Sequence, residues 1–329
     1  MLIDIHSHVI PDRIVAAMAA DPDRFQARIA GEGAARKVIH DQGYVYPLFD
    51  EFHKVDAKIE AMDRKGVDIS VISPAPPMFY YWADADLALE VAGLVNDGVA
   101  DMVGDKPERL RGMATVPMQH PDAAVAELER VVREYGFKAV EIGTSIEGAQ
   151  LSEERFRPLL RRASELGVFV FAHPYYVGAK SGLESFYLTN LIGNPLDTTV
   201  MIANLMFSGR LDELPDLKIV LAHGGGFVPY QIGRLVHGHA VRSETHGISK
   251  SSPKELLKRI YFDSLVFEPQ ALRYLIDLVG ADQICIGTDA PFDMADDRPQ
   301  ATLDAVPRIT ATERQCVCCR TALKLLREG

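Results

Sequence analysis

Two histidines, His6 and His8, are separated by one residue and follow an apolar run at positions 2–5. Side chains two residues apart on a β-strand point to the same face, so a strand here presents both imidazoles side by side. Neutral imidazole is the commonest nitrogen ligand of zinc and similar ions. The pair therefore supplies half of a metal site, and the other half must come from elsewhere in the chain.

Eight short runs rich in β-branched residues predict the strands that position such ligands. Most of these runs are separated by amphipathic segments that are typical of helices. Apolar strands alternating with helices indicate a parallel sheet covered on its outer side, and eight repeats in 329 residues close most economically as a (β/α)8 TIM-like barrel. The predicted strands are residues 2–5, 67–73, 110–116, 138–142, 168–172, 218–222, 260–264 and 283–287, and the clearest helices are 84–103, 123–135, 153–166 and 269–279.

A doubly wound open sheet is the alternative architecture within the α/β class. It would bind a dinucleotide through a glycine-rich motif after a strand, and the glycines at 224–226 lack the spacing of that motif. We therefore expect one barrel domain over residues 1–329. Residues 12–52 are expected to form a small inserted lobe with a hairpin, and residues 174–215 contain two further helical pieces.

The carboxyl ends of the predicted strands carry further ligands. The fifth strand ends at His173, the sixth at His223 and the eighth in the segment that contains Asp289. Catalytic groups of a barrel lie at this end of its strands, so these residues should meet His6 and His8 at one mouth. Such a set binds a divalent ion and leaves a coordination position for water or substrate.

Each of these residues also has a structural interpretation. A histidine at a strand end often serves as a cap, and Asp289 before Ala-Pro can simply begin a turn. The convergence of five such positions on strand ends favours the metal site. The fourth strand ends in residues 140–144 without the lysine that bridges two ions in binuclear hydrolases of this architecture, so we expect one ion. The other histidines are expected to be structural: His40, His53, His120, His237, His239 and His246.

Composition narrows the class of partners and the compartment. The formal charge of −11 argues against nucleic acid and against an anionic membrane surface. No run approaches the roughly 20 apolar residues that span a bilayer, and the start of the chain lacks the pattern of a signal peptide, so we expect a cytoplasmic protein. The cysteines predict reduced thiols, with a zinc knuckle at Cys316, Cys318 and Cys319 as the alternative.

The motifs around these residues resemble the amidohydrolase superfamily, and within it the decarboxylase branch. They run along nearly the whole chain as IDIHSHVIP, AMDRKGVDISVIS, PPMFYYWA, GMATVPMQ, FAHPYY, LAHGGGFVPYQIGR and IGTDAPF. The paired histidines and the final aspartate are shared across the superfamily, whereas PPMFYYWA and HGGGFVPYQIGR are much more particular. The resemblance implies one divalent ion, with zinc expected and manganese as the alternative. It implies that the ligands are His6, His8, His173 and Asp289, and that His223 is the acid/base group.

The resemblance also implies contacts with the substrate. An arginine that matches Arg234 enters the active site of the neighbouring subunit, which implies a homodimer, and Phe292 matches an aromatic wall of the pocket. Two positions depart from the family pattern. Lys58 stands where an arginine grips a substrate carboxylate, and Tyr187 stands where a tryptophan is usual. Lysine keeps the charge of arginine but loses its bidentate fork.

The implied reaction is a metal-dependent, non-oxidative decarboxylation of a small anionic carboxylate. The expected substrate is a 2-amino- or 2-hydroxycarboxymuconate semialdehyde or a related aromatic acid. In one route His223 helps to deprotonate metal-bound water, and in another the substrate chelates the ion while Asp289 or His223 protonates the carbon. Two other classes stay open: a metal-dependent hydrolase of a lactone, amide or carbon–carbon bond, and a catalytically silent barrel.

Overall fold

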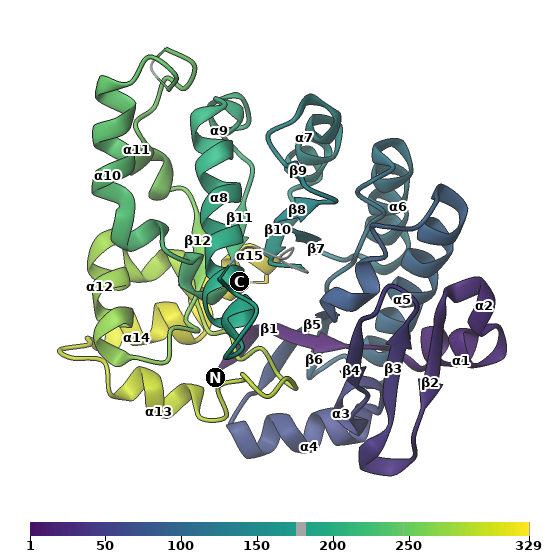
Figure 1. Ribbon diagram of the computed structural model, residues 1–329. Coiled ribbons are helices and arrows are strands. Elements are labelled where there is room, and N and C mark those ends of the chain that lie inside the picture. The colour runs from purple at the N-terminus through teal and green to yellow at the C-terminus, as the bar shows by residue number, and fades with distance from the viewer. Residues whose placement is uncertain (176–181, 246, 329) are drawn as a thin grey trace.

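Eight parallel strands form the centre of the molecule (Figure 1). The computed structural model describes residues 1–175, 182–245 and 247–328, and each of the eight predicted runs contains or overlaps one of these strands. The strands are β1 (Ile3–Val9), β5 (Ile69–Pro74), β6 (Leu110–Gly112), β7 (Ala139–Gly143), β10 (Phe169–His173), β11 (Ile219–Leu221), β12 (Tyr261–Asp263) and β13 (Ile284–Cys285).

The strands close into a ring in chain order. Continuous ladders join them as β1-β5-β6 and as β13-β12-β11-β10-β7. Three single parallel bridges connect these two groups: Ala114 with Val140 at one seam, and Asp4 with Ile286 and Ser7 with Ala290 at the other. The N–H of Ile5 also donates to the carbonyl of Ile286 at 3.0 Å. This closure is the TIM-like barrel that the sequence predicts.

Helices connect consecutive strands and surround the ring (Figure 1). In α6, residues Ala124, Leu128 and Val131 lie on one face and are buried, which is the spacing of an amphipathic helix packed on a core. The helix ends at Gly136, whose φ of 68° suits glycine at a helix terminus. The helices outside the lobe are α4 (Val55–Lys65), α5 (Ala85–Asp105), α6 (Pro121–Tyr135), α7 (Arg157–Leu166), α8 (Asn194–Phe207), α9 (Arg210–Glu213), α10 (Val228–Val241), α11 (Pro253–Leu257), α12 (Pro269–Val279), α13 (Pro299–Asp304), α14 (Ala311–Gln315) and α15 (Thr321–Leu326).

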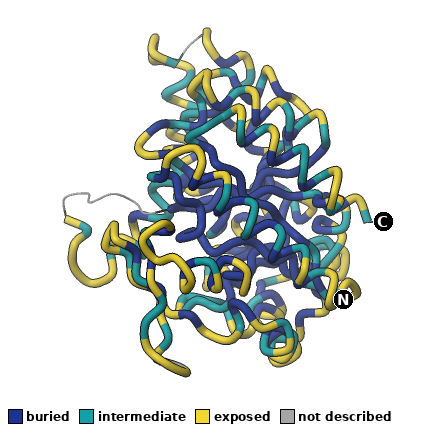
Figure 2. Tube along the Cα trace, turned by 90° about the vertical axis from the view of Figure 1, so that its right-hand side faces the viewer, coloured by how far each residue is buried: buried dark blue, intermediate teal, exposed yellow. Residues whose placement is uncertain are grey.

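The buried part of the chain lies around the strands, and the exposed part lies at the periphery (Figure 2). Alternate strand residues such as Phe169 and Phe171 form an interior cluster with Leu325 and other residues of α15. The strand residues between them, such as Val170, join a second cluster beneath the outer helices. This alternation decides which side chains can reach the interior of the barrel.

Residues 12–52 form the expected insertion between β1 and β5, but the hairpin prediction was incomplete. The lobe holds a three-stranded antiparallel sheet in the order β2-β3-β4, because the short run 27–30 pairs with the predicted hairpin. Its elements are α1 (Asp12–Ala20), α2 (Pro22–Phe25), β2 (Ala27–Ala30), β3 (Lys37–His40), β4 (Val45–Pro47) and α3 (Asp50–His53). The lobe packs through an apolar cluster that includes Ile14, Val38 and Phe52 and continues onto α5 at residues such as Val91.

A short ribbon of β8 (Ser145–Ile146) and β9 (Ala149–Gln150) follows β7. Across the described ranges, none of the helices combines the length and the apolar character that a bilayer span requires. The single-domain assignment of residues 1–329 stays a prediction.

Candidate metal centre

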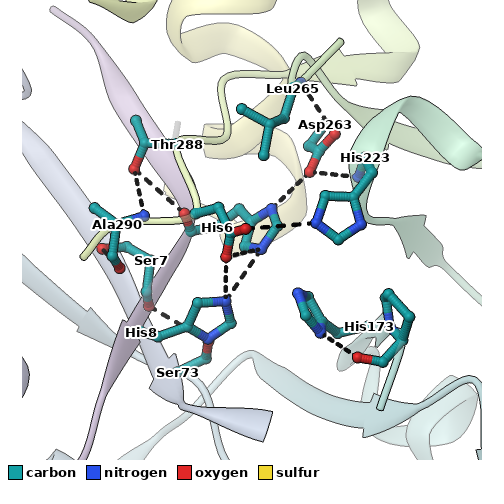
Figure 3. A network of polar contacts seen from close by, with 12 residues as sticks. His6, Ser7, His8, Ser73, His173, His223, Asp263, Leu265, Thr288 and Ala290 are labelled. Carbon is teal, nitrogen blue, oxygen red and sulfur yellow. Dashed lines mark hydrogen bonds and ion pairs between the residues drawn. The ribbon is translucent and has the colours of Figure 1, made fainter. Parts of the chain in front are cut away.

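An irregularity in β1 aims its two histidines into the barrel. The pairing of β1 with β5 is irregular between Asp4 and Ser7. Asp4 pairs with Ser70 and Ser7 pairs with Ile72, so β1 advances by three residues where β5 advances by two. Such a bulge changes the direction of the side chains that follow it. His6 and His8 consequently face the interior together (Figure 3). The predicted strand 2–5 was too short, since β1 continues through both histidines to Val9.

Four buried side chains converge at the carboxyl end of the barrel. The ligand atoms of His6, His8, His173 and Asp289 all lie within 4.8 Å of one another, and this is the only such group in the described part of the chain. The Nε2 atoms of His6 and His8 are 3.1 Å apart. They lie 3.3 Å and 3.1 Å from Oδ1 of Asp289. The structure thus brings together the four residues that the sequence predicts as ligands.

The second ring nitrogen of each histidine has an acceptor that orients the ring. Nδ1 of His6 lies 2.6 Å from Oδ2 of Asp263. Nδ1 of His8 lies 3.3 Å from the carbonyl at the end of β5, and Nδ1 of His173 lies 2.8 Å from the carbonyl of the next residue. A proton on each Nδ1 leaves the Nε2 lone pair free for a metal ion, which is the usual arrangement of metal-binding histidines.

The charges at the centre suit a cation. Burial alone would lower the pKa of His6, but the carboxylates of Asp289 and Asp263 outweigh it and raise that pKa to about 10. Burial lowers the pKa of His8 to about 4 and that of His173 well below its usual range. Nε2 of His173 and Oδ1 of Asp289 are buried without a hydrogen-bond partner. The residues therefore fit a divalent ion, which would satisfy these atoms and supply the positive charge.

His223 stands beside this group without belonging to it. Its Nε2 lies 3.6 Å from Oδ2 of Asp289, while its Nδ1 has no hydrogen-bond partner. The backbone φ is 54° at His223 and 63° at Asp289, in the left-handed region that non-glycine residues seldom adopt. Such backbone strain concentrates at functional sites. The position of His223 is that of a group that can exchange a proton with a molecule bound at the centre.

Asp263, at the end of β12, was missed by the sequence analysis although its carboxylate organises the centre. One oxygen accepts hydrogen bonds from His6 and from the backbone N–H of His223, the latter at 2.9 Å (Figure 3). The other accepts from the backbone N–H groups of Gly224 at 2.7 Å and Leu265 at 3.1 Å. A usable signal was present, because alternation places Asp263 on the same interior face as Tyr261.

Glu141 is a second buried carboxyl group that the sequence analysis passed over. It lies on β7, and its Oε1 is 3.8 Å from Nδ1 of His8. Burial raises the pKa of Glu141 to about 8, so the protonated form is favoured near neutral pH. The sequence analysis considered this strand for a bridging lysine and did not consider the glutamate itself.

The centre opens into a cavity with two arms. The lobe arm, of about 360 Å³, is bordered by β4 of the lobe and by His173, and it contains Tyr187, Phe292 and Asp293. The apolar arm, of about 290 Å³, lies between the segments that follow β11 and β12. Both arms share Asn190, Asn194, His223, Asp289 and Met294, which we call the junction. Phe292 lines the lobe arm, with its ring centroid 5.2 Å from that of His8, and its contact with a substrate stays a prediction.

Lys58 does not lie in this cavity, which corrects the prediction that it grips a substrate carboxylate. Its side chain is buried on the other side of β1, where Nζ donates to the carbonyl of His8 at 3.1 Å and to that of Ala290 at 3.5 Å. Burial lowers the pKa of Lys58 to about 8, while the charge of Asp4 opposes that shift. The position supports the backbone that carries His8 rather than a ligand.

Arg234 is exposed on α10 and lines neither arm, so a single chain does not bring it to the centre. Among the other histidines, His40 bonds to Tyr46, His53 to Asp12 and His239 to a backbone carbonyl. These contacts agree with the structural roles predicted for them. His120 also contacts a carbonyl, His237 is exposed, and His246 lies outside the described residues.

The zinc-knuckle alternative at the cysteines is not supported within the described residues. Cys316, Cys318 and Cys319 lie in one helical turn and belong to no group that could hold an ion. Sγ of Cys318 faces a guanidinium nitrogen of Arg314 at 3.7 Å, and Sγ of Cys319 donates to the carbonyl of Gln315 at 3.5 Å.

Comparison with known proteins connects this site to a family. The sequence model described as amidohydrolase matches residues 3–327. A 2-amino-3-carboxymuconate-6-semialdehyde decarboxylase from Dictyostelium discoideum is 33% identical over 272 residues, which cover 82% of this chain and 76% of the relative.

Two solved structures extend the likeness. An IDCase from Metarhizium anisopliae superimposes with a TM-score of 0.85 at 25% identity and covers 100% of this chain and 97% of its own. A dihydroxybenzoic acid decarboxylase from Polaromonas sp. JS666, solved with bound manganese and the inhibitor 2-nitroresorcinol, superimposes with a TM-score of 0.81 at 25% identity, covering 99% of this chain and 96% of its own.

Proposed function

Because this chain belongs to the amidohydrolase family, we propose that it is a metal-dependent, non-oxidative decarboxylase, that is, a carbon–carbon lyase. Its substrate is an aromatic carboxylate or a carboxymuconate semialdehyde with a 2-amino or 2-hydroxy group, the kinds of acid named for its relatives. The observation that carries the proposal is the set of three oriented histidines and one carboxylate with His223 beside it.

The proposed ligands are His6, His8, His173 and Asp289. Three neutral nitrogen ligands and one carboxylate suit zinc, and manganese is the alternative because a similar decarboxylase contains it. When bound, a divalent ion supplies Lewis acidity and a fixed position for an oxygen of the substrate or of water. The protein has to supply the rest: orientation of the substrate, exclusion of water and transfer of a proton.

The junction is the place where these tasks meet. His223 and Asp289 are shared by both arms, so a carboxylate bound there lies within reach of both side chains. Loss of carbon dioxide breaks a carbon–carbon bond and leaves the electron pair on carbon, which must then accept a proton. His223 is the proposed donor, because its free Nδ1 and its Nε2 near Asp289 allow it to hold and pass a proton. Asp289 can orient the imidazole and stabilise its charged form.

Arg234 is proposed to act from a second subunit. It is exposed on α10, the helix that follows the loop of His223, and its planar guanidinium suits a bidentate contact with a carboxylate. In a homodimer the Arg234 side chain of each chain would enter the neighbouring cavity. With Lys58 placed behind β1, Arg234 is the remaining cationic group proposed for substrate binding. The cytoplasmic location stays a prediction.

Release of carbon dioxide from defined acids tests the proposal. The protein is stripped of metal, reloaded with zinc or with manganese, and given 2,6-dihydroxybenzoate, 2,4-dihydroxybenzoate and an aminocarboxymuconate semialdehyde. We expect metal-dependent carbon dioxide release from at least one acid, and none from a His173→Ala protein. A hydrolase would instead consume esters, lactones or amides without forming carbon dioxide. That result, in metal-loaded protein, would refute the decarboxylase assignment.

A further inference from the structure

The apolar arm, of about 290 Å³, offers more space than the carboxylate group of a substrate fills. Beyond the junction, its lining consists mainly of apolar side chains, which are Leu191, Pro195, Phe227, Leu265, Val266 and Phe267. Surfaces of this kind bind apolar groups by removing them from water. The lobe arm differs, since Tyr187, Thr189 and Asp293 give it hydrogen-bonding groups.

The loop that forms the far wall of this arm is held in place from two sides. The N–H of Leu265 donates to the carboxylate of Asp263, the same group that orients His6. Val266 packs so closely on Gly224 that a Cβ there would lie 2.3 Å from a Val266 methyl carbon. Phe267 has a φ of 57°, which is rare for an aromatic residue. The arm is therefore a formed cavity whose wall begins next to His223.

The charges of the two arms limit what can be bound. Among the described residues that line them there is no lysine or arginine, and Asp293 adds a carboxyl group to the lobe arm. A second carboxylate on the substrate would face this acidic group, whereas a hydroxyl or amino group could donate to it. The one cation proposed to reach the cavity is the Arg234 side chain of a second chain, which can pair with a single carboxylate at the junction.

From these observations we infer that the substrate is a planar monocarboxylate with an alkyl or aryl substituent. Its carboxylate lies at the junction, a hydroxyl or amino group points into the lobe arm, and the substituent fills the apolar arm against Val266. This inference rests on the proposed decarboxylase function and selects one class among its substrates. Burial of one methylene is equivalent to about a fourfold gain in binding, from about 0.8 kcal/mol per methylene.

A homologous series of acids tests the inference. The wild-type holoenzyme is given 2,4-dihydroxybenzoates that carry hydrogen, methyl or propyl at position 6, and kcat/KM is measured by carbon dioxide release. We expect about a fourfold rise per added methylene. Val266→Phe should lower the ratio of propyl to unsubstituted acid at least tenfold, and Val266→Ala should shift the preference towards longer chains. Val241→Phe, on an exposed residue of α10 outside both arms, is the matched control.

A binding measurement separates this inference from the proposed function. The 5-alkylresorcinols, which are the products of this series, are titrated into the metal-loaded protein by calorimetry. A chain-length dependence that the two Val266 variants alter in opposite directions supports the apolar subsite even if no acid is decarboxylated. A wild-type protein that ignores chain length in both assays would overturn the subsite. Val266→Phe could also change the sedimentation behaviour of the protein and leave both chain-length dependences unaltered. That result would show that a second chain covers the arm, and it would also overturn the subsite.

Discussion

Oδ2 of Asp263 lies 2.6 Å from Nδ1 of His6, and the same atom accepts the backbone N–H of His223. One buried carboxylate therefore fixes a metal ligand and the loop that carries the proposed proton donor. Hydrogen bonds from the imidazole and the backbone keep the pKa of Asp263 below its usual range, although burial alone would raise it. Gly287 lies beside this pair. A Cβ at this position would lie 2.7 Å from Cβ of Asp263 and 2.9 Å from Cβ of His6, so the close packing requires glycine.

Asp263→Asn should weaken metal binding while the fold persists. An amide can still accept from the backbone N–H groups, but its NH2 group would face Nδ1–H of His6 and favour the wrong tautomer. We expect the affinity for zinc to fall about 10- to 100-fold, as is typical of such outer-shell changes. Competition with a chelator of known affinity measures the change. Unaltered affinity would mean that Asp263 only supports the loop.

His173→Ala and His223→Gln should separate metal binding from proton transfer. The first removes a proposed ligand, so metal content and turnover should fall together. The second should keep about one ion per chain and lower turnover by about 10²- to 10⁴-fold, the contribution expected of an acid/base group. Metal analysis of the purified proteins, beside a His120→Ala control, measures the first quantity. Loss of zinc from His223→Gln in proportion to turnover would make His223 a ligand.

Lys58→Met should destabilise the fold without changing the affinity for substrate. The substitution keeps most of the volume but removes the ammonium that binds the carbonyls of His8 and Ala290. Loss of hydrogen bonds from a charged donor suggests a decrease of about 2 kcal/mol in the free energy of unfolding. Urea unfolding measures this decrease, and steady-state kinetics measures KM. A large rise in KM at unchanged stability would restore the carboxylate-binding role.

His40 should make the stability of the protein depend on pH between about 6.5 and 4. Burial lowers the pKa of His40 to about 4, and its Nε2 is hydrogen-bonded to Tyr46. In that range the unfolded chain binds a proton that the folded lobe excludes, so stability falls as pH decreases, by up to roughly 3 kcal/mol. Urea unfolding at several pH values should show a shallower dependence for His40→Gln than for His237→Gln, which alters an exposed histidine. Parallel curves for both would disprove this source.

A mixture of two inactive proteins should test the position of Arg234. Arg234→Ala lacks the proposed cross-subunit contact, and His223→Ala lacks the proton donor. In a heterodimer, one of the two sites combines an intact His223 with an intact Arg234 from the other chain. Activity should therefore reappear on mixing and reach a fraction of the wild-type value. If subunit exchange is demonstrated and the mixture stays inactive, the shared-site proposal fails.

The sequence predicted the barrel well, because two patterns indicate it: apolar strands alternate with amphipathic helices, and polar candidate ligands recur at the carboxyl ends of those strands. All eight runs became parallel strands, and the ligands were found by reading their carboxyl ends. Asp263 was missed because attention went to residues that follow the strands, whereas its side chain lies within β12. Alternation with Tyr261 would have revealed its interior position.

Lys58 shows the opposite error. The match to the family pattern predicted that Lys58 binds a carboxylate of the substrate. Its helix α4 instead packs behind β1, where the side chain donates to the carbonyl of His8. No local pattern in the sequence states which side of a strand a neighbouring helix covers. The third strand of the lobe was similarly hidden, because four residues carry too little periodicity to be read as a strand.

The ring of strands consists of two arcs that meet at isolated bridges and a few backbone hydrogen bonds rather than along continuous ladders. His6 and His8 belong to the arc of β1, β5 and β6, whereas His173 lies on β10 in the other arc and Asp289 follows β13 there. An ion held by all four would link the arcs across the junction of β1 with β13, where isolated bridges take the place of a continuous ladder. Metal loading would then stabilise the architecture as well as the chemistry, so that loss of the ion loosens the barrel at its seam.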